Sequence, residues 1–228
     1  MGFYRSMDAI SGRYCRYGKG RDFYFLDFNV PVTAISSAPF NGGFRKVKRY
    51  INRQVPIDYN HDPVEEIGSF LDQNKFPGEE CVVTITACDL EKALIKQISI
   101  DGIYILVSIT ACFANALSIG GSGLNLPGAV NVAVFTDFGL STAGGLNLYQ
   151  SIIEAKSQAF NDFGIKDRTT GKPSPGTSTD TTSLFLVQAE NGSDYGGRLT
   201  EIGKRVSLAV YNGLNHIHSN SGDKDLLD

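Results

Sequence analysis

Continuous apolar runs and alternating apolar segments predict most of the strands in this chain. Residues 81–86, 102–109 and 130–135 are rich in β-branched residues, which is typical of strands that are buried on both faces. Four further strands are predicted at residues 13–17, 22–28, 32–37 and 183–187. The segment Gly18-Lys19-Gly20 between the first two of these is a typical hairpin turn.

Other segments carry apolar residues at helical spacing. Helices are predicted at residues 44–51, from residue 62 towards residue 77, at residues 143–163 and at residues 199–217. Asp62 and Pro63 are a typical helix cap and first helical position. Thr200 is expected to cap the last helix, and Gly164 to end the one before it.

Strands and helices mix along the chain without a linker. The pattern therefore predicts one α/β (or α+β) domain over residues 1–228, in which helices cover a mixed β-sheet. Its N-terminal strands are expected at residues 13–37. A polar tail is expected from about residue 218 to residue 228.

Composition and charge exclude several classes of protein. The 228 residues include 21 Lys+Arg and 24 Asp+Glu, which gives a net charge of -3 and argues against a nucleic-acid-binding protein. No run of apolar residues is long enough to span a membrane, and the first residues lack the apolar core of a secretory signal. We therefore expect a cytoplasmic protein without a membrane partner.

The cysteines and histidines do not form a recognisable metal motif. No Cys-x-x-Cys pair occurs, so Cys15, Cys81, Cys88 and Cys112 are expected to be reduced and buried, and Cys112 is read as a structural thiol rather than a nucleophile. His216 and His218 fall in or beside the predicted polar tail. His61 remains as an exposed loop residue or a base.

Two charged or glycine-rich segments have more than one interpretation. The glycines at residues 120–128 precede a strand rather than a helix, which is the wrong order for a dinucleotide fingerprint, so a loop is favoured. The basic residues between Arg45 and Arg53 are read as the solvated face of a helix. The glycines ahead of that helix keep an anion-binding role open.

The most unusual segment is residues 176–182. It places five hydroxyl side chains, one carboxylate and a glycine between a proline-containing loop and a predicted strand. A hydroxyl next to a carboxylate can act as an oriented nucleophile or can position a water molecule. A polar turn that only enters the strand explains the same residues. Glu154 and Lys156 belong to the exposed face of the long helix, or Lys156 reaches this site.

Seven short segments occur in an order that matches a known family. They are residues 36–43, 52–59, 86–89, 115–116, 128–131, 153–160 and 176–180. Together they resemble the adenosylcobinamide amidohydrolase (CbiZ) family, over most of the chain from about residue 32 to about residue 214. The last two are similar to the family's Thr-Glu-Ala-Lys helix and Gly-Thr-Gly-Thr-Asp loop, although Ser178 replaces a glycine.

The resemblance implies hydrolysis of the amide between the aminopropanol arm and the corrin ring of adenosylcobinamide, in cobamide (vitamin B12) salvage. The corrinoid is then the substrate and carries its own cobalt, and no cofactor or protein-bound metal is expected. The expected catalytic residues are Thr177, Ser178, Thr179, Asp180 and Lys156. The expected substrate-binding residues are Asn41, Gly42, Gly43, Asp89, Asn115, Asn131, Glu154 and Gly176.

Two other functions remain open from the sequence. In open α/β sheets ligands bind in a crevice beyond the strand ends, and a corrinoid-binding module without turnover would hold its ligand in that crevice as the enzyme would. A nucleotide-using oxidoreductase would rest on the glycines at residues 120–128 alone. Incubation with adenosylcobinamide separates the three functions. Formation of product indicates the hydrolase, tight binding without product indicates the binding module, and an absorbance change that depends on nicotinamide indicates the oxidoreductase.

Overall fold

A mixed β-sheet is the framework of the computed structural model, which describes residues 14–123, 128–189 and 191–221. Within these residues eight strands join in the order β4-β3-β2-β8-β7-β6-β5, and β1 pairs with β2. The strands are β1 (Cys15–Lys19), β2 (Phe23–Ser36), β3 (Gly43–Gln54), β4 (Cys81–Thr86), β5 (Leu94–Ile100), β6 (Ile103–Ala111), β7 (Val130–Leu140) and β8 (Thr181–Gln188). Since β3/β4 and β7/β8 are parallel and the other pairs antiparallel, the predicted mixed sheet is confirmed.

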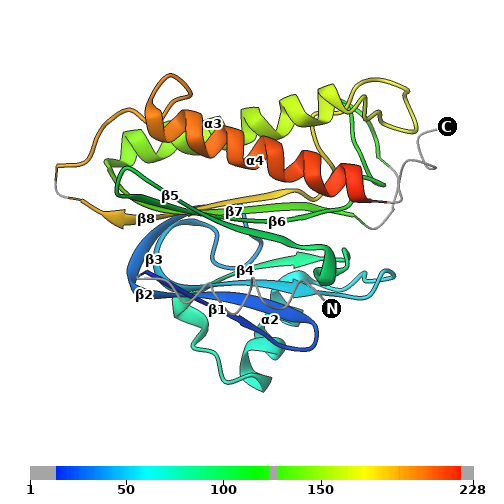
Figure 1. Cartoon of the computed structure of the whole chain (residues 1–228). Coiled ribbons are helices and arrows are strands. Elements are labelled where there is room, and N and C mark those ends of the chain that lie inside the picture. Colours follow the sequence, from blue (N-terminus) through cyan, green and yellow to red (C-terminus); the bar gives the residue numbers. More distant parts are fainter. Residues whose placement is uncertain (1–13, 124–127, 190, 222–228) are drawn as a thin grey trace.

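The sheet curls, so that strands β1–β4 lie against strands β5–β8 (Figure 1). We call these the N-terminal and C-terminal half-sheets. Strand β2 joins them, because its residues 33–36 pair with β8 while its residues 24–28 pair with β1. Its register against β3 shifts between Asp27 and Val32, and Pro31 lies in this irregular stretch, where a strand tolerates proline and bends.

Helices cover both outer faces of the curled sheet (Figure 1). Helices α3 (Thr142–Asp162) and α4 (Glu201–Asn220) pack on the C-terminal half-sheet, and α2 (Pro63–Gln73) packs on the N-terminal half-sheet. A third apolar cluster fills the space between the half-sheets. Strands β6 and β7 are therefore buried on both faces, as their sequences predict, and β8 is buried in the same way.

The predicted helix ends are confirmed by their capping contacts. The Asp62 carboxylate accepts hydrogen bonds from the amides of the first turn of α2. The Thr200 hydroxyl accepts one from the amide of Gly203. Gly164 follows α3 with a φ of 70°, a left-handed conformation that favours glycine.

The helix predicted at residues 44–51 is wrong, because these residues form part of strand β3. Strand β3 pairs with β2 on one side and β4 on the other, and this pairing outweighs the local helical spacing. Asn41 and Gly43, with φ of 56° and 86°, form the tight turn from β2 into β3. The anion-binding role that depended on a helix after these glycines therefore disappears.

Three smaller expectations also differ from the structure. The runs at residues 22–28 and 32–37 belong to one long strand, β2, and strand β5 was not predicted. The prediction that the tail begins at about residue 218 is wrong for residues 218–220, because α4 continues to Asn220 and the ring of His218 stacks on Phe163. Residue 13 and residues 222–228 lie outside the described residues. Within the described ranges, α2, α3 and α4 lack the length or the apolar character that a membrane span requires.

Candidate active site

A cavity of about 660 Å³ lies at one end of the curled sheet, where several strands begin or end. It is bounded by the segments that follow β2, β3 and β4 and by those that precede β7 and β8. Its lining comes from Ser37, Pro39, residues 55–60, Pro63, and residues 85–87, 128–129 and 179–181. This position agrees with the expectation that a ligand binds beyond the strand ends.

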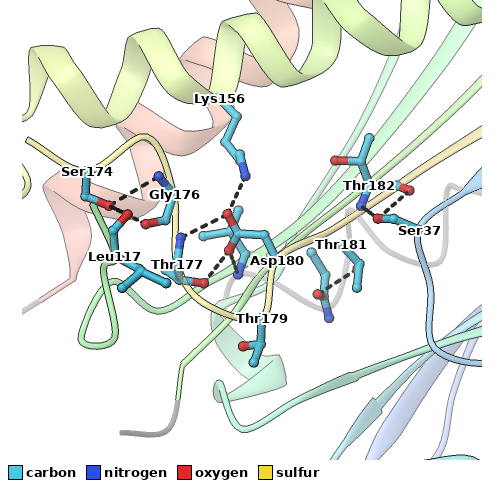
Figure 2. Close-up of polar contacts among 12 residues, drawn as sticks. Ser37, Leu117, Lys156, Ser174, Gly176, Thr177, Thr179, Asp180, Thr181 and Thr182 are labelled. Atoms are coloured by element: carbon cyan, nitrogen blue, oxygen red, sulfur yellow. Dashed lines mark hydrogen bonds and ion pairs between the residues drawn. The ribbon is translucent and has the colours of Figure 1, made fainter. Parts of the chain in front are cut away.

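The carboxylate of Asp180 is held from four directions on the wall of this cavity (Figure 2). One oxygen accepts hydrogen bonds from the amide of Val130, at 2.9 Å, and from the Thr177 hydroxyl. The other accepts from the amide of Thr177, at 3.0 Å, and forms an ion pair with Lys156. A carboxylate offers about four acceptor positions, so this one is fully occupied.

Lys156 reaches the site from helix α3, as one of its two sequence interpretations proposed. Its side chain and that of Asp180 are each 11% exposed, so the ion pair is largely shielded from water. In this setting each charge depends on the other, because removing one would leave an uncompensated buried charge. Glu154, two residues earlier, instead pairs with Arg198 on the outer surface, away from the cavity lining.

Gly176 allows the loop to close around this ion pair. A Cβ atom at this position would collide with the Asp180 carboxylate and approach the Lys156 ammonium group to 2.8 Å. The carbonyl oxygen of Gly176 accepts a hydrogen bond from the Ser174 hydroxyl, and also one from the amide of Leu117, at 3.0 Å. Any larger side chain would therefore displace the loop from Asp180.

The hydroxyls of the loop have different partners. Thr177 donates to Asp180, whereas Thr179, which lines the cavity, donates to the carbonyl oxygen of Gly128 at 2.6 Å. Ser178 accepts a hydrogen bond from the side-chain amide of Asn115 at 3.0 Å. Of these three hydroxyls, that of Thr177 is the one that donates to a carboxylate, which can act as a base.

Asn131 lies beneath the cavity rather than in it. It is fully buried, donates to Asn52 and to the carbonyl oxygen of Ile85, each at 3.0 Å, and accepts from the Thr181 hydroxyl at 2.8 Å. Ile85 and Thr181 line the cavity. Asn131 and Asn52 therefore fix the floor and join the two half-sheets there.

Other residues expected to bind substrate lie outside the cavity lining. The Asn41 side chain donates to the carbonyl oxygens of Gly78 and Cys81, and a Cβ on Gly42 would collide with the carbonyl oxygen of Ala38. The Asp89 side chain caps a short 3₁₀ helix. The structure thus gives Asn41, Gly42 and Asp89 local structural contacts and gives Gly43 the turn described above.

The structure also adds residues that sequence reasoning did not select. Residues 55–60 form a large part of the cavity wall, and Asn52 lies under the floor. The signal available for both was the segment at residues 52–59 that resembles the family. Assigning a helix to residues 44–51 hid the fact that this segment is the end of a strand and the loop beyond it.

None of the four cysteines is in a disulfide, and three of them are buried. The Cys88 thiol donates to the carbonyl oxygen of Ala129 at 3.3 Å, next to the cavity. Burial, and secondarily the charge of Asp27, raises the pKa of Cys15 to about 12. Burial likewise raises the pKa of Cys81 to about 11, so both thiols stay protonated. Across the described residues, no three histidine, cysteine, aspartate or glutamate side chains gather closely enough to hold a metal ion.

His61 lies on the surface beside the cavity loop. Its ring meets the ring of Tyr59 edge to face at 5.8 Å. Burial, followed by the charges of Glu66 and Asp62, raises the pKa of Tyr59 above its usual value of 10.0. Tyr59 is therefore a neutral phenol in the cavity wall at physiological pH.

Comparison with known proteins adds two findings. The family model for adenosylcobinamide amidohydrolase, CbiZ, matches residues 8–221 of the chain. Among curated proteins, the uncharacterized protein MJ1613 of Methanocaldococcus jannaschii is 24% identical over 194 residues, which cover 74% of this chain and 75% of that protein.

Proposed function

Because this chain belongs to the adenosylcobinamide amidohydrolase family, we propose that it hydrolyses the amide joining the aminopropanol arm to the corrin ring of adenosylcobinamide. The products are adenosylcobyric acid and aminopropanol. The observation that carries the proposal is Asp180, which lies on the wall of a cavity and is bonded there to Lys156 and to the Thr177 hydroxyl, in a chain that the family matches almost throughout. Cobalt belongs to the substrate, and the protein supplies no cofactor.

The chemistry we propose starts from the contact between Asp180 and Thr177. The Thr177 oxygen attacks the carbonyl carbon of the amide while its proton passes to Asp180. Asp180 then gives this proton to the nitrogen of aminopropanol as the C–N bond breaks. Water attacks the resulting ester and loses a proton to Asp180, which returns it to the Thr177 oxygen as the ester C–O bond breaks.

Lys156 has an electrostatic role in this scheme. While Asp180 is ionised, Lys156 is paired with it. Protonation of Asp180 removes that counter-charge at the moment when the substrate carbonyl becomes a tetrahedral oxyanion. The positive charge of Lys156 is then available to the oxyanion, and its effect is strong because the site is shielded from water.

The test of the activity is incubation of the purified protein with adenosylcobinamide, with adenosylcobyric acid measured by chromatography. Product that accumulates with time, and that is missing with Asp180→Asn, supports the proposal. In this variant an NH₂ group replaces one carboxylate oxygen and faces groups that donate hydrogen bonds to that oxygen in the wild type. We therefore expect Asp180→Asn to lose stability as well. A denaturation curve in the assay buffer gives the folded fraction, and the rate per folded molecule is the quantity to compare.

One observation favours a second function. Every acceptor position of Asp180 is occupied, which a loop with a purely structural role would also require. The alternative is a corrinoid-binding module without turnover. Tight binding of adenosylcobinamide without product would establish it.

The proposal includes the cytoplasm as the place of the reaction. The cysteines support this, since none of the four is in a disulfide and disulfides form mainly in oxidising compartments. The partner is then a small corrinoid molecule rather than a nucleic acid or a membrane, in keeping with the net charge of -3.

A further inference from the structure

The mouth of the cavity is formed by a loop of mixed apolar and polar residues, 55–60, whose flexibility is restricted. Residues 55–60 begin with Val55, whose amide donates to the carbonyl oxygen of Thr86 at 2.9 Å. Pro56 follows and accepts a hydrogen bond from the amide of Tyr59 at 3.1 Å, which closes a turn. Pro39 and Pro63 also line the cavity, and proline fixes one backbone angle at each of these positions.

Ile57 lies at the exposed end of this loop. Its side chain lines the cavity and is 73% exposed, whereas the Asp180 side chain on the reacting wall is 11% exposed. The two residues therefore mark the outside and the inside of the same cavity. An isolated exposed isoleucine needs no explanation, but one at the rim of a cavity is placed to contact a ligand.

The size of the cavity limits how much of a corrinoid can enter. A volume of about 660 Å³ encloses a ligand of ordinary drug size. A corrin macrocycle with its amide side chains and an adenosyl group is far larger than such a ligand. The reacting amide must nevertheless reach Asp180, so the arm that carries it has to enter while the ring stays outside.

We propose, resting on the proposed function, that the cavity admits only the aminopropanol arm of the substrate and that residues 55–60 support the corrin ring at its mouth. Ile57 packs on the apolar face of the ring and is a specificity-determining residue. The prolines hold this platform in place before the substrate binds, which reduces the entropy lost on binding.

The direct test compares Ile57→Ser with Ile57→Leu and with Leu199→Ser. Leu199 is 99% exposed and lies outside the cavity lining, so it is a matched control for loss of a surface apolar side chain. We expect Ile57→Ser to raise both KM and the equilibrium Kd for adenosylcobinamide roughly tenfold, the order expected when an isoleucine loses a buried contact. Leu199→Ser should leave both constants unchanged, and Ile57→Leu, which keeps an apolar side chain of the same size, should raise them less than Ile57→Ser does. Equal constants for Ile57→Ser and wild type would overturn the proposal.

Competition experiments identify which part of the substrate enters. N-(2-hydroxypropyl)propionamide reproduces the arm and its amide without the ring. It should inhibit competitively, with the same inhibition constant for wild type and Ile57→Ser, because it does not reach the rim. Competition by adenosine but not by this amide would mean that the adenosyl group fills the cavity, and would contradict the proposal.

The two proposals fail in different ways. If adenosylcobinamide binds without being hydrolysed, the activity is wrong, and the effect of Ile57→Ser on Kd still tests the platform. If hydrolysis occurs and Ile57→Ser changes neither constant, the platform is wrong and the activity stands. Absence of both binding and hydrolysis would refute both.

Discussion

The two ends of the interface between the half-sheets are built from different kinds of side chain. Strands β6, β7 and β8 contribute three successive cross-strand rows to this interface. The row nearest the cavity consists of Thr110, Asn131 and Thr181, the next of Ser108, Ala133 and Ser183, and the farthest of Leu106, Phe135 and Phe185. The side chains thus change from polar through small to large and apolar with distance from the cavity.

The contacts across the interface follow the same order. In the farthest row, Phe28 stacks on Phe135 with ring centroids 5.3 Å apart and meets Phe185 at 4.9 Å. In the row nearest the cavity, the side chain of Asn52 donates to Thr110 and accepts from Asn131. Aromatic packing tolerates small shifts, whereas a network of amides has one arrangement in which every donor meets an acceptor. We infer that the aromatic row contributes stability and the polar row fixes the geometry of the cavity.

The largest effect is expected beside the polar row, at Thr177. Thr177→Val keeps the size of the side chain but removes the hydroxyl bonded to Asp180, so kcat should fall by on the order of 10²–10⁴. Thr179→Val removes a hydroxyl that contacts the carbonyl oxygen of Gly128 and the side-chain amide of Asn115 but no carboxylate, so it should retain most of the activity. Thr177→Ser keeps the hydroxyl and should therefore retain turnover. If the rates of the two valine variants were reversed, Thr179 would be the reacting residue.

A large change confined to stability is expected at the aromatic row. Phe135 is fully buried, and Phe135→Ala should lower the free energy of unfolding by about 3–5 kcal/mol. Chemical denaturation measures this loss. The value of kcat/KM under conditions where the variant is folded should stay close to that of wild type. A matching loss of kcat/KM would contradict the division of roles between the rows.

A smaller loss of stability together with a loss of activity is expected at the polar row. Asn131→Ala leaves Asn52, Ile85 and Thr181 each without one buried hydrogen-bond partner. We expect the free energy of unfolding to fall by about 2–3 kcal/mol, because each unsatisfied buried group costs about 1–3 kcal/mol before relaxation. KM should rise, since the floor of the cavity is no longer fixed. An unchanged KM would mean that the row is structural only.

The smallest effect is expected from alkylation of the cysteines. With pKa values of about 12 and about 11, Cys15 and Cys81 carry neutral thiols at pH 8 and lie in the interior. Thiolate is the reactive form, so iodoacetamide should leave both unmodified in the native protein and modify them after unfolding. Peptide mass spectrometry provides the measurement. Modification under native conditions would mean that the edge of the N-terminal half-sheet opens readily.

The sequence was sufficient to predict the elements whose local signals agree with their packing. Helix α3 has an apolar stripe and ends at Gly164, and α2 has both Asp62 and Pro63 at its start. Strand β3 was misassigned, because its identity depends on neighbours that are distant in sequence. Pairing with β2 and β4 makes residues 44–51 extended, and no local pattern records that pairing.

The candidate site was predictable in part for the same reason. The loop at residues 176–180 could be selected because it concentrates hydroxyls and a carboxylate in a few adjacent positions. Its contact with Lys156 was one of two open interpretations, and the fold decides between them. The rows across β6, β7 and β8 could not be foreseen, because they depend on the register between strands that are separated by a loop or a helix.

The position of β8 in the sheet has a consequence for how the protein is made. This strand lies between β2 and β7, although both precede it in the chain, and Ser37 and Thr182 are hydrogen-bonded across 145 residues of sequence. Until β8 has been synthesised, β2 and β7 have unpaired edges, and the cavity lacks the wall that Thr179, Asp180 and Thr181 provide. Long-range pairing of this kind slows folding. A nascent chain therefore completes this cavity in a late step, when β8 inserts between two strands that are already present.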